Sequence, residues 1–580
     1  MSAARELSNL AVLVVDCQTT GATPVLGAVL ELGWCVARAS TPELEQAQAH
    51  WLTLSGDHSV SRHIRRLTGF DERRLVGALA PEAAWQRLRM SLPSAPMPTV
   101  IHFATFELRF LRDFAARFEP QRPFPFDAVC VHAIACRLYP ELPRRSLRAL
   151  AGYLGHGLDL ARRSLGHVEA TAFIWRKLCA ELETRGVRHW EELGDWLREA
   201  PRSARPKKRR YPIATSRYRE LPDSPGVYRF VRSNGDVLYV GKAASLKQRV
   251  KSHFSAASTR EHTVEMLTQV SDVLVTLTPT ALEAAVLENE SIKALRPPYN
   301  LQLTAYDREA WFATRGFDSA STSPDDVYRI GPLPSKLSLS PLAALMSLAS
   351  GAPSTRSLRA RAVATAERWA PDEAVFGAGF DELVRAQLAA GASPALSARR
   401  NVLGVAKRLV SSRLVAKLLE EAPRDDALSD TAPNGEAELG AAELELRAPA
   451  SWDPERVTRH LERALAQAYQ LLRRAQWLLL LHDCAIVYRE PGSDRARQLI
   501  IASGDLVEAS DFGVERAIIA PERPRWRTAR VAFDRAKYDR LRVLSSELKR
   551  VRRDGGNLAV YVAPARPLGE RVLAGIFGYI

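Results

Sequence analysis

The feature that most constrains the fold of this chain is an Asn-Gly pair between two short β-prone runs. Asn234-Gly235 separates residues 227–231 from residues 237–240, and both runs consist largely of β-branched and aromatic residues. An Asn-Gly pair in this position is a strong hairpin signal, because a type I′ turn requires positive φ at both central residues. We therefore expect an antiparallel hairpin that brings the strand of Tyr228 beside the strand of Tyr239.

The residues after this hairpin continue the pattern of a small α/β unit. Residues 245–254 have apolar side chains at helical spacing, and Arg249 falls on the opposite, polar face of the predicted helix. Residues 272–278 alternate as a third strand, and residues 280–295 have the pattern of a helix with Glu288 at its middle. The sequence therefore predicts a sheet with helices, and both predicted helices carry a charged candidate.

These elements carry side chains that suit the cutting of a phosphodiester. A hard cation takes oxygen ligands and keeps several waters, and a guanidinium matches phosphate oxygens and stays protonated. Taken singly, such residues more often serve as packing or as a solvated surface, so their joint spacing is what predicts a site. The set is Tyr228, Tyr239, Arg249, Glu288 and, after a Pro-Pro pair, Asn300.

Residues 222–303 resemble the GIY-YIG nuclease domain of the UvrC excinuclease and of its shorter Cho-type relatives. Gly226-Val227-Tyr228 and Tyr239-Val240-Gly241 supply the two motifs, and Tyr299-Asn300 closes the segment. Further matching blocks lie at 246–249 and 283–293, in the order and spacing of the family. The resemblance implies a three-stranded antiparallel sheet with helices. It also implies metal-dependent hydrolysis that leaves a 5′-phosphate and a 3′-hydroxyl.

The resemblance also implies a role for each candidate. Glu288 would hold one Mg²⁺ or Mn²⁺, and Arg249 would brace the scissile phosphate. Tyr239 would activate the attacking water. A phenol with a pKa near 10 is a poor base at neutral pH, so Tyr239 would need help from Lys242, from Tyr228 or from the metal. Asn300 would orient the site.

The first 185 residues resemble a second nuclease family, the DnaQ-like (DEDD) exonucleases with their RNase H-like α/β fold. An apolar strand ends at Asp16, a second block surrounds Glu107, and a third lies at 162–172. Members of this family use four acidic residues to hold two metal ions, together with a basic His or Tyr. Here Gln18, Glu107 and His167 stand where acidic ligands are expected, Glu107 in place of an Asp, and Arg162 stands where the basic His is expected.

The acidic set of this second site is reduced by half. Only Asp16 and Glu107 remain as carboxylates, and Arg162 cannot accept a proton because a guanidinium stays charged. We therefore expect a degenerate, inactive exonuclease-like domain. The alternative is a 3′–5′ exonuclease with a rearranged site of Asp16, Glu107 and His167 that takes Mn²⁺ or Zn²⁺.

The positive charge of the chain is concentrated in two segments. The net charge is +15, and residues 200–219 contain eight basic side chains and no acidic ones. A second basic segment lies at 521–553. Such clusters favour contact with phosphate. We expect DNA as the partner, contacted by Lys207, Lys208, Arg209 and Arg210; a solvated tether is the alternative.

Composition and the placement of proline-bearing linkers predict a multidomain α/β chain. We expect it in the cytoplasm, associated with the nucleoid, and the sequence leaves its oligomeric state open. Six cysteines show no disulfide-like spacing, and no apolar run is long enough to span a membrane. The predicted order ends with a helical region and an α+β domain without a recognised catalytic motif. The predicted segments are 1–185 (exonuclease-like), 186–212 (basic linker), 213–305 (GIY-YIG), 306–420 (helical), 421–450 (acidic linker) and 451–580 (α+β).

The expected function is a structure- or damage-specific DNA endonuclease that makes a single-strand incision in DNA repair. Damage-recognition proteins of excision repair are the expected protein partners. The competing hypothesis from another class is a non-catalytic nucleic-acid-binding scaffold in which both nuclease folds are inactive.

Overall fold

The computed structural model describes residues 5–54, 60–61, 64–65, 68–92, 96–157, 163–199, 210–255, 261–300, 309–365, 367–389, 398–411, 451–513, 533–563, 566–569 and 572–573. By their contacts these residues form two units. The first contains the described residues up to Leu277 together with Pro297–Asn300, and the second contains Thr278–Arg296 and the described residues after 300. Among the candidates, Arg162, Lys207, Lys208 and Arg209 lie outside the described residues, as does the predicted acidic linker.

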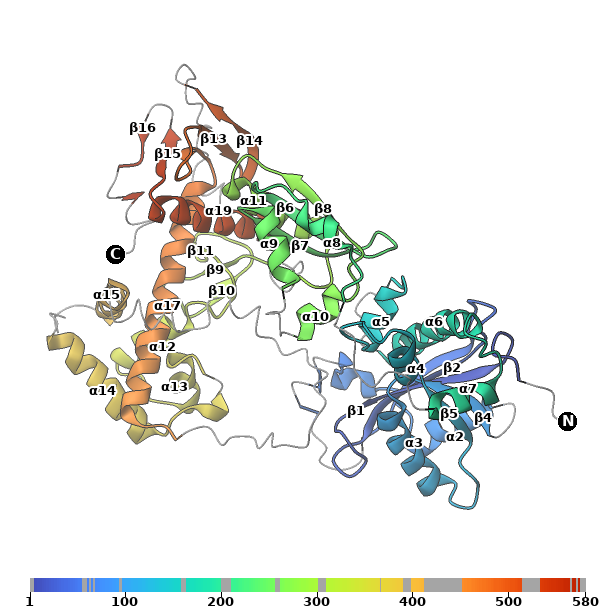
Figure 1. Cartoon of the computed structure of the whole chain (residues 1–580). Helices are drawn as coiled ribbons and strands as arrows, with labels where there is room; N and C mark the ends of the chain where they lie inside the picture. The colour runs from blue at the N-terminus through green and yellow to red at the C-terminus, as the bar shows by residue number, and fades with distance from the viewer. Residues whose placement is uncertain are drawn as a thin grey trace. The chain divides into compact units, whose positions relative to one another are not determined.

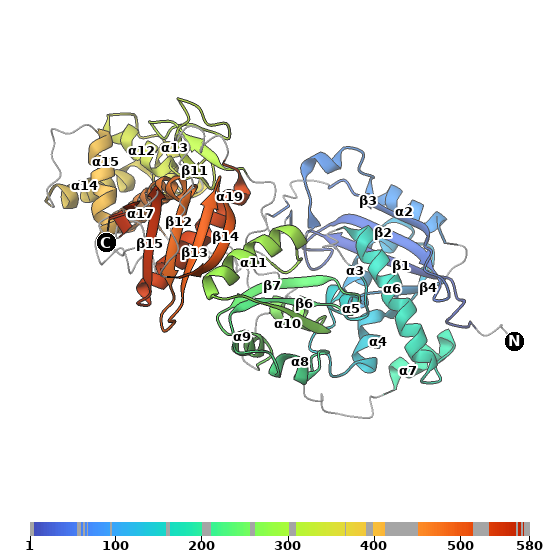
Figure 2. The same cartoon turned by 90° about the horizontal axis from the view of Figure 1, so that it is seen from above.

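A five-stranded mixed sheet forms the centre of the N-terminal domain (Figures 1 and 2). Its order is β3-β2-β1-β4-β5, in which β1 pairs antiparallel with β2, β2 antiparallel with β3, β4 parallel with β1 and β5 parallel with β4. This arrangement confirms the α/β fold class expected for the domain. The strands are Val12–Thr19 (β1), Val29–Ala37 (β2), Glu45–Trp51 (β3), Met97–Ile101 (β4) and Phe126–Cys130 (β5).

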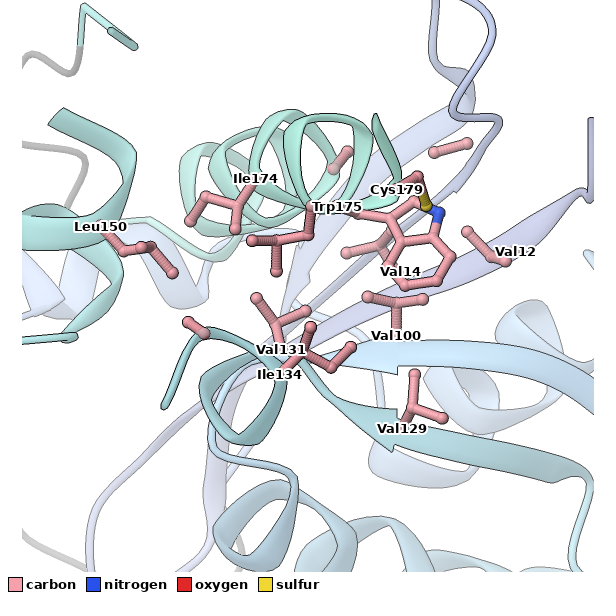
Figure 3. Close-up of a cluster of buried hydrophobic side chains, with 14 of the residues drawn as sticks. Val12, Val14, Val100, Val129, Val131, Ile134, Leu150, Ile174, Trp175 and Cys179 are labelled. Atoms are coloured by element: carbon pink, nitrogen blue, oxygen red, sulfur yellow. The ribbon is translucent and has the colours of Figure 1, made fainter. Parts of the chain in front are cut away.

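Helices cover both faces of this sheet, because alternate side chains of each strand point to opposite sides. Val12 and Val14 of β1 pack with α4–α7, whereas Leu13 and Val15 pack with α2 and α3. Figure 3 shows the first of these cores, where Trp175 of α6 lies among the valines of the sheet. The helices are α2 (Pro81–Met90), α3 (Ala104–Phe118), α4 (Val131–Leu138), α5 (Leu147–Tyr153), α6 (Ser164–Glu183) and α7 (Trp190–Arg198), with a 3-10 turn at Glu72–Leu75.

The N-terminal core extends past the boundary predicted at residue 185. Trp190 and Leu193 of α7 are 4% and 0% exposed and belong to this core. α7 is therefore part of the domain rather than of the basic linker predicted for 186–212. Its apolar residues Trp190, Leu193 and Leu197 stand at helical spacing, so the sequence carried this signal and the predicted boundary overlooked it.

The second sheet of the first unit confirms the predicted hairpin and third strand. β6 (Gly226–Val231) pairs antiparallel with both β7 (Val237–Ala243) and β8 (Asp272–Leu277), giving the order β7-β6-β8. α9 (Leu246–His253) begins after Ser245, whose side chain accepts from the Gln248 amide. The remaining helices here are α8 (Thr215–Arg219) and α10 (Glu261–Leu267), of which α10 was not predicted.

The turn of this hairpin differs from the predicted type I′ turn. Gly235 has a φ of 90°, but Asn234 is not among the residues with positive φ. The loop is longer than two residues, since the amide of Arg232 donates to the carbonyl of Asp236 at 3.0 Å. Asn234 instead accepts from the Asp236 amide through its side chain, so one glycine in the left-handed region is sufficient.

The second unit begins with α11 (Ala281–Leu295), the predicted helix that carries Glu288. The long helix α17 (Pro454–Leu481) packs its first part among other helices and its last turns against the C-terminal sheet. This sheet has the order β14-β13-β12-β15-β16, and α19 packs on it (Figure 1). Its elements are β12 (Cys484–Arg489), β13 (Ala496–Ala502), β14 (Asp505–Phe512), α19 (Arg535–Arg553), β15 (Asn557–Ala563) and β16 (Arg566–Pro567).

Residues 306–420 contain a small sheet that was not predicted for this mostly helical region. Its strands are only two to four residues long in the described structure, too short to give a periodic signal. β14 was also missed, because most of its side chains are exposed and several are acidic. The elements of the region are β9 (Trp311–Ala313), β10 (Ala320–Ser321), β11 (Ile330–Leu333), α12 (Ser340–Ala349), α13 (Arg356–Ala362), a 3-10 turn (Glu367–Trp369), α14 (Glu373–Ala389) and α15 (Ala398–Ser411).

Among the described residues, no helix combines the length and the apolar character that a bilayer crossing requires.

Candidate functional site

Tyr228 and Tyr239 meet on one face of the β6–β7 hairpin. In the strand register Tyr228 lies opposite Gly241, and Tyr239 lies opposite Phe230. The two phenol rings are diagonal neighbours with centroids 6.0 Å apart. Residues two apart on a strand share a face, so Tyr239 and Gly241 both lie on the side of Tyr228. The hairpin thus brings together the two phenols that the sequence singled out.

Gly241 is the position that permits this convergence. A Cβ atom built there would lie 2.5 Å from the Cζ and Oη atoms of Tyr228 and 2.8 Å from Cε1 of Tyr239. Atoms of any side chain would therefore overlap both rings. The requirement for glycine comes from the close approach of the two phenols and not from the backbone conformation, because Gly241 is not a positive-φ residue.

A histidine that the sequence did not indicate completes this phenol pair. The hydroxyl of Tyr228 lies 2.7 Å from Nε2 of His253, and Tyr228 is fully buried. Burial, together with the nearby Arg249 cation, lowers the pKa of His253 to about 4. The imidazole is therefore neutral at pH 7 and can share a hydrogen bond with the phenol. His253 lies four residues after Arg249 on α9, and this spacing is the sequence signal that could have revealed His253.

Arg249 and Lys242 take different positions around the pair. Arg249 is exposed on α9, the helix that supplies His253. Lys242 is half-buried and lies opposite Val227 in the register, so strand alternation places it on the face away from Gly241. Of the two side chains predicted to help Tyr239, Tyr228 is the one that packs beside its ring.

Asn300 forms two hydrogen bonds with the main chain of β7, the strand that carries Tyr239. Its Oδ1 accepts from the amide of Val240 at 2.9 Å, and its Nδ2 donates to the carbonyl of Val240 at 2.8 Å. The amide of Tyr299 also donates to the carbonyl of Leu238 at 3.1 Å. The carboxamide of Asn300 is 8% exposed and is committed to the backbone beside Tyr239. This geometry makes Asn300 a residue that positions β7.

Glu288 belongs to the second unit, where α11 is fixed by ion pairs. Lys293 lies 2.8 Å from Asp539 of α19, which is 1% exposed, and Glu283 lies 2.8 Å from Arg497 of β13. Glu288 itself is half-buried. The structure therefore brings together the phenols and Asn300 in one unit, and the carboxylate lies on a helix of the other unit that makes two ion pairs there.

The donor set suits one hard cation. Among the described residues, no three His, Cys, Asp or Glu side chains gather as a metal site. A cation bound at Glu288 would therefore have at most two such ligands from the described residues and keep most of its waters, which fits Mg²⁺ better than a softer metal.

The described candidates in the N-terminal domain are connected by hydrogen bonds near the end of β1. Nδ1 of His167 lies 3.1 Å from Oδ1 of Asp16 and 3.1 Å from Nε2 of Gln18. A protonated Nδ1 donates to Asp16 and an unprotonated one accepts from Gln18, so these two bonds are alternatives. Oε2 of Glu107 accepts from the amide of Cys17 at 2.8 Å. The structure thus brings together the described members of the predicted site, and Arg162 lies outside the described residues.

Comparisons with known proteins agree with this division of the chain. Residues 224–301 match the model of the UvrC-like GIY-YIG domain. UvrABC system protein C of Alkalilimnicola ehrlichii is 53% identical over 85 residues, which are 15% of this chain and 14% of that protein. A Mycobacterium tuberculosis protein, provisionally named a bifunctional exonuclease/endonuclease, is 29% identical over 353 residues, 58% of this chain and 52% of its own length.

Two solved structures are similar to parts of this chain. The magnesium-bound GIY-YIG N-terminal endonuclease domain of UvrC from Thermotoga maritima is 29% identical, and the match covers 15% of this chain and 92% of that one, with a TM-score of 0.14. Exonuclease X in complex with 5′ overhanging duplex DNA is 18% identical, and the match covers 32% of this chain and 99% of that one, with a TM-score of 0.25.

The segment 224–301 is therefore a GIY-YIG domain of the UvrC type. The chain joins it to an exonuclease-like domain on its N-terminal side, as the shared stretch with the Mycobacterium protein supports. The matches span about half of that relative, at 52%, and only 14% of the A. ehrlichii UvrC protein.

We expect Gly241→Ala to destabilise the GIY-YIG domain. The new methyl group must displace both phenol rings, and overpacking of this kind costs about 1–3 kcal/mol. Chemical unfolding measured by circular dichroism checks this. Gly194→Ala is the control: it lies in α7 with no described atom within 4 Å of the added methyl, so it should be stabilising by about 0.5–1 kcal/mol. Equal effects of the two substitutions would contradict the close approach.

We also expect the imidazole of His253 to remain neutral well below pH 6. Its pKa of about 4 against an ordinary value of 6.5 means that protonation opposes its burial. Nuclear magnetic resonance of histidine-labelled protein measures this, with the signal identified by its loss in His253→Gln. A midpoint near 6.5 would show that the ring is not buried against Tyr228.

Proposed function

We propose that this chain is a metal-dependent DNA endonuclease whose GIY-YIG domain makes a single-strand incision. The observation that carries the proposal is the convergence of Tyr228 and Tyr239 over Gly241, within a segment that matches the UvrC-like GIY-YIG domain. A hydrophobic core does not require two hydroxyl-bearing rings at this spacing, whereas phosphodiester hydrolysis requires groups that orient and deprotonate a nucleophile.

Each residue has a role that its position supports. Tyr239 is half-buried and receives the nucleophile's proton. The hydrogen bond of Tyr228 to His253 orders the ring beside Tyr239. The exposed guanidinium of Arg249 binds the scissile phosphate, for which its planar fork is suited. Asn300 keeps the strand of Tyr239 in register.

Glu288 is proposed to hold the divalent cation. When bound, Mg²⁺ or Mn²⁺ supplies positive charge that stabilises the leaving oxygen. The chain itself contributes the anchoring of α11. The ion pairs of this helix with Arg497 and Asp539 hold the helix that carries Glu288 in place.

The exonuclease-like domain is proposed to be catalytically inactive. Of the four ligand positions only Asp16 and Glu107 are carboxylates, and Glu107 is bonded to the main chain beside Asp16. His167 points its Nδ1 at Asp16, so with a proton on Nδ1 it donates to the carboxylate that a metal would need. The provisional name of the Mycobacterium relative includes exonuclease activity, which keeps a rearranged site as a second outcome to be tested.

The cellular role proposed is incision in DNA repair, together with damage-recognition proteins, at the nucleoid in the cytoplasm. This rests on the likeness of the segment to UvrABC system protein C and on the basic composition of the chain. The basic side chains Lys207, Lys208, Arg209 and Arg210 are proposed as non-specific phosphate contacts.

Substitution of the metal ligand tests the activity. We expect Glu288→Gln to reduce the nicking of damaged or branched DNA in Mg²⁺ or Mn²⁺ by about 10²–10³-fold, comparable to the loss of one preorganised electrostatic group. Glu290→Gln is the matched control, since this neighbour on α11 is exposed and pairs with Arg540. The measurement is the single-turnover rate of conversion of supercoiled to nicked plasmid.

Two results would contradict the proposal. Equal nicking by Glu288→Gln and the wild type would remove the metal site from α11. An absence of metal-dependent nicking by the wild type would favour the non-catalytic scaffold. In the same assay, degradation of single strands that is lost only with Asp16→Ala would show a rearranged exonuclease site.

A further inference from the structure

The exonuclease-like domain and the GIY-YIG domain contact each other within the first unit. Oγ of Ser146, at the start of α5, donates to Oε2 of Glu265 on α10 at 2.8 Å. Nη1 of Arg148 lies 3.5 Å from Oε1 of the same carboxylate. One turn away, Arg144 pairs with Glu261 at 3.2 Å. Two ion pairs therefore cross this contact, and they have different partners on α10.

Glu265 connects this contact to the end of the GIY-YIG motif. The hydroxyl of Tyr299 donates to Oε1 of Glu265 at 2.9 Å and accepts from Nε2 of Gln269 at 2.5 Å. Tyr299 is 4% exposed, and burial beside Glu265 raises the pKa of its phenol well above the ordinary value. The phenol therefore remains a proton donor, and its hydroxyl cannot move away without breaking both bonds.

Further hydrogen bonds fix the side chain of Gln269 where α5 contacts the GIY-YIG domain. Oε1 of Gln269 accepts from Nε and Nη2 of Arg232 at 3.1 and 2.8 Å, and Arg232 is 4% exposed. A Cβ atom at Gly152 of α5 would lie 2.0 Å from that Gln269 oxygen. The backbone of α5 therefore lies directly on a side chain whose position is fixed by a buried guanidinium.

Tyr299 connects this cluster to β7, the strand that carries Tyr239. Its amide donates to the carbonyl of Leu238, and the adjacent Asn300 binds both main-chain groups of Val240. These two residues flank Tyr239. A connected path thus runs from α5 through Glu265 and Tyr299 to the backbone on both sides of Tyr239.

We propose that Ser146 and Arg148 of the exonuclease-like domain are positioning residues for the GIY-YIG site, acting through Glu265 and Tyr299 on β7. This inference rests on the proposed endonuclease function. It assigns the exonuclease-like domain a role that needs no exonuclease activity, because its α5 surface holds the strand of Tyr239 in register. Neither residue touches the candidate reacting groups.

The test compares the two ion pairs of the contact in the full-length chain. We expect Arg148→Gln to lower kcat for nicking about tenfold with KM unchanged, and Arg144→Gln to leave both unchanged. Tyr299→Phe, which retains the ring but loses the hydroxyl, should lower kcat by a similar factor. The double variant Arg148→Gln/Tyr299→Phe should lose no more than Tyr299→Phe alone, because both lie on one path. Ser146→Asp keeps a side chain that can cap α5 but sets a carboxylate against Glu265, and should resemble Arg148→Gln.

Hydrogen exchange of the Val240 amide distinguishes this proposal from the proposed function. This amide is bonded to Asn300, so its exchange should accelerate about tenfold in Arg148→Gln and not in Arg144→Gln, whether or not the wild type cuts DNA. Unchanged Val240 exchange in both Arg148→Gln and Tyr299→Phe would overturn the positioning role. Equal loss of kcat in Arg144→Gln and Arg148→Gln would overturn it as well, since that would indicate general docking of the domains.

Discussion

The candidate site depends on the absence of a side chain at Gly241. Its backbone lies against the rings of Tyr228 and Tyr239, with 2.5 Å between an added Cβ and the Tyr228 hydroxyl. This close approach sets the positions of both phenols, because their strands are also locked in register by β6–β7 pairing. The buried contact of Tyr228 with His253 then fixes the ring from the side of α9. Hydrogen bonding and packing together leave Tyr239 as the partly accessible phenol of the pair.

The parts of the GIY-YIG domain are held by other domains of the chain. In the first unit, α5 of the exonuclease-like domain contacts Glu265, which supports Tyr299 and so the edge of β7. In the second unit, buried Asp539 of α19 pairs with Lys293 and anchors the helix of Glu288. Catalytic groups must be held within fractions of an ångström of a productive geometry. Domains without a recognised active site can provide this support from outside the GIY-YIG domain.

The sequence predicted the elements that have strong local signals. The hairpin, α9, β8 and α11 were all expected, since Asn234-Gly235 and helical spacing are properties of adjacent residues. The sequence did not reveal the hydrogen bond of His253, the commitment of Asn300 to Val240 or the burial of Trp190, because each depends on a tertiary contact between segments far apart in the chain. The type I′ turn was wrong because the Asn234 side chain stabilises a longer loop.

The central claim is that the Tyr228–Tyr239 pair performs chemistry and is not only core packing. The most direct measurement is the single-turnover rate of metal-dependent nicking by Tyr239→Phe, since phenylalanine preserves the ring and removes only the hydroxyl. We expect a loss of about 10²–10⁴-fold, as for a general base, with the free energy of unfolding nearly unchanged. A nicking rate equal to that of the wild type would contradict the account and would assign the pair to the core.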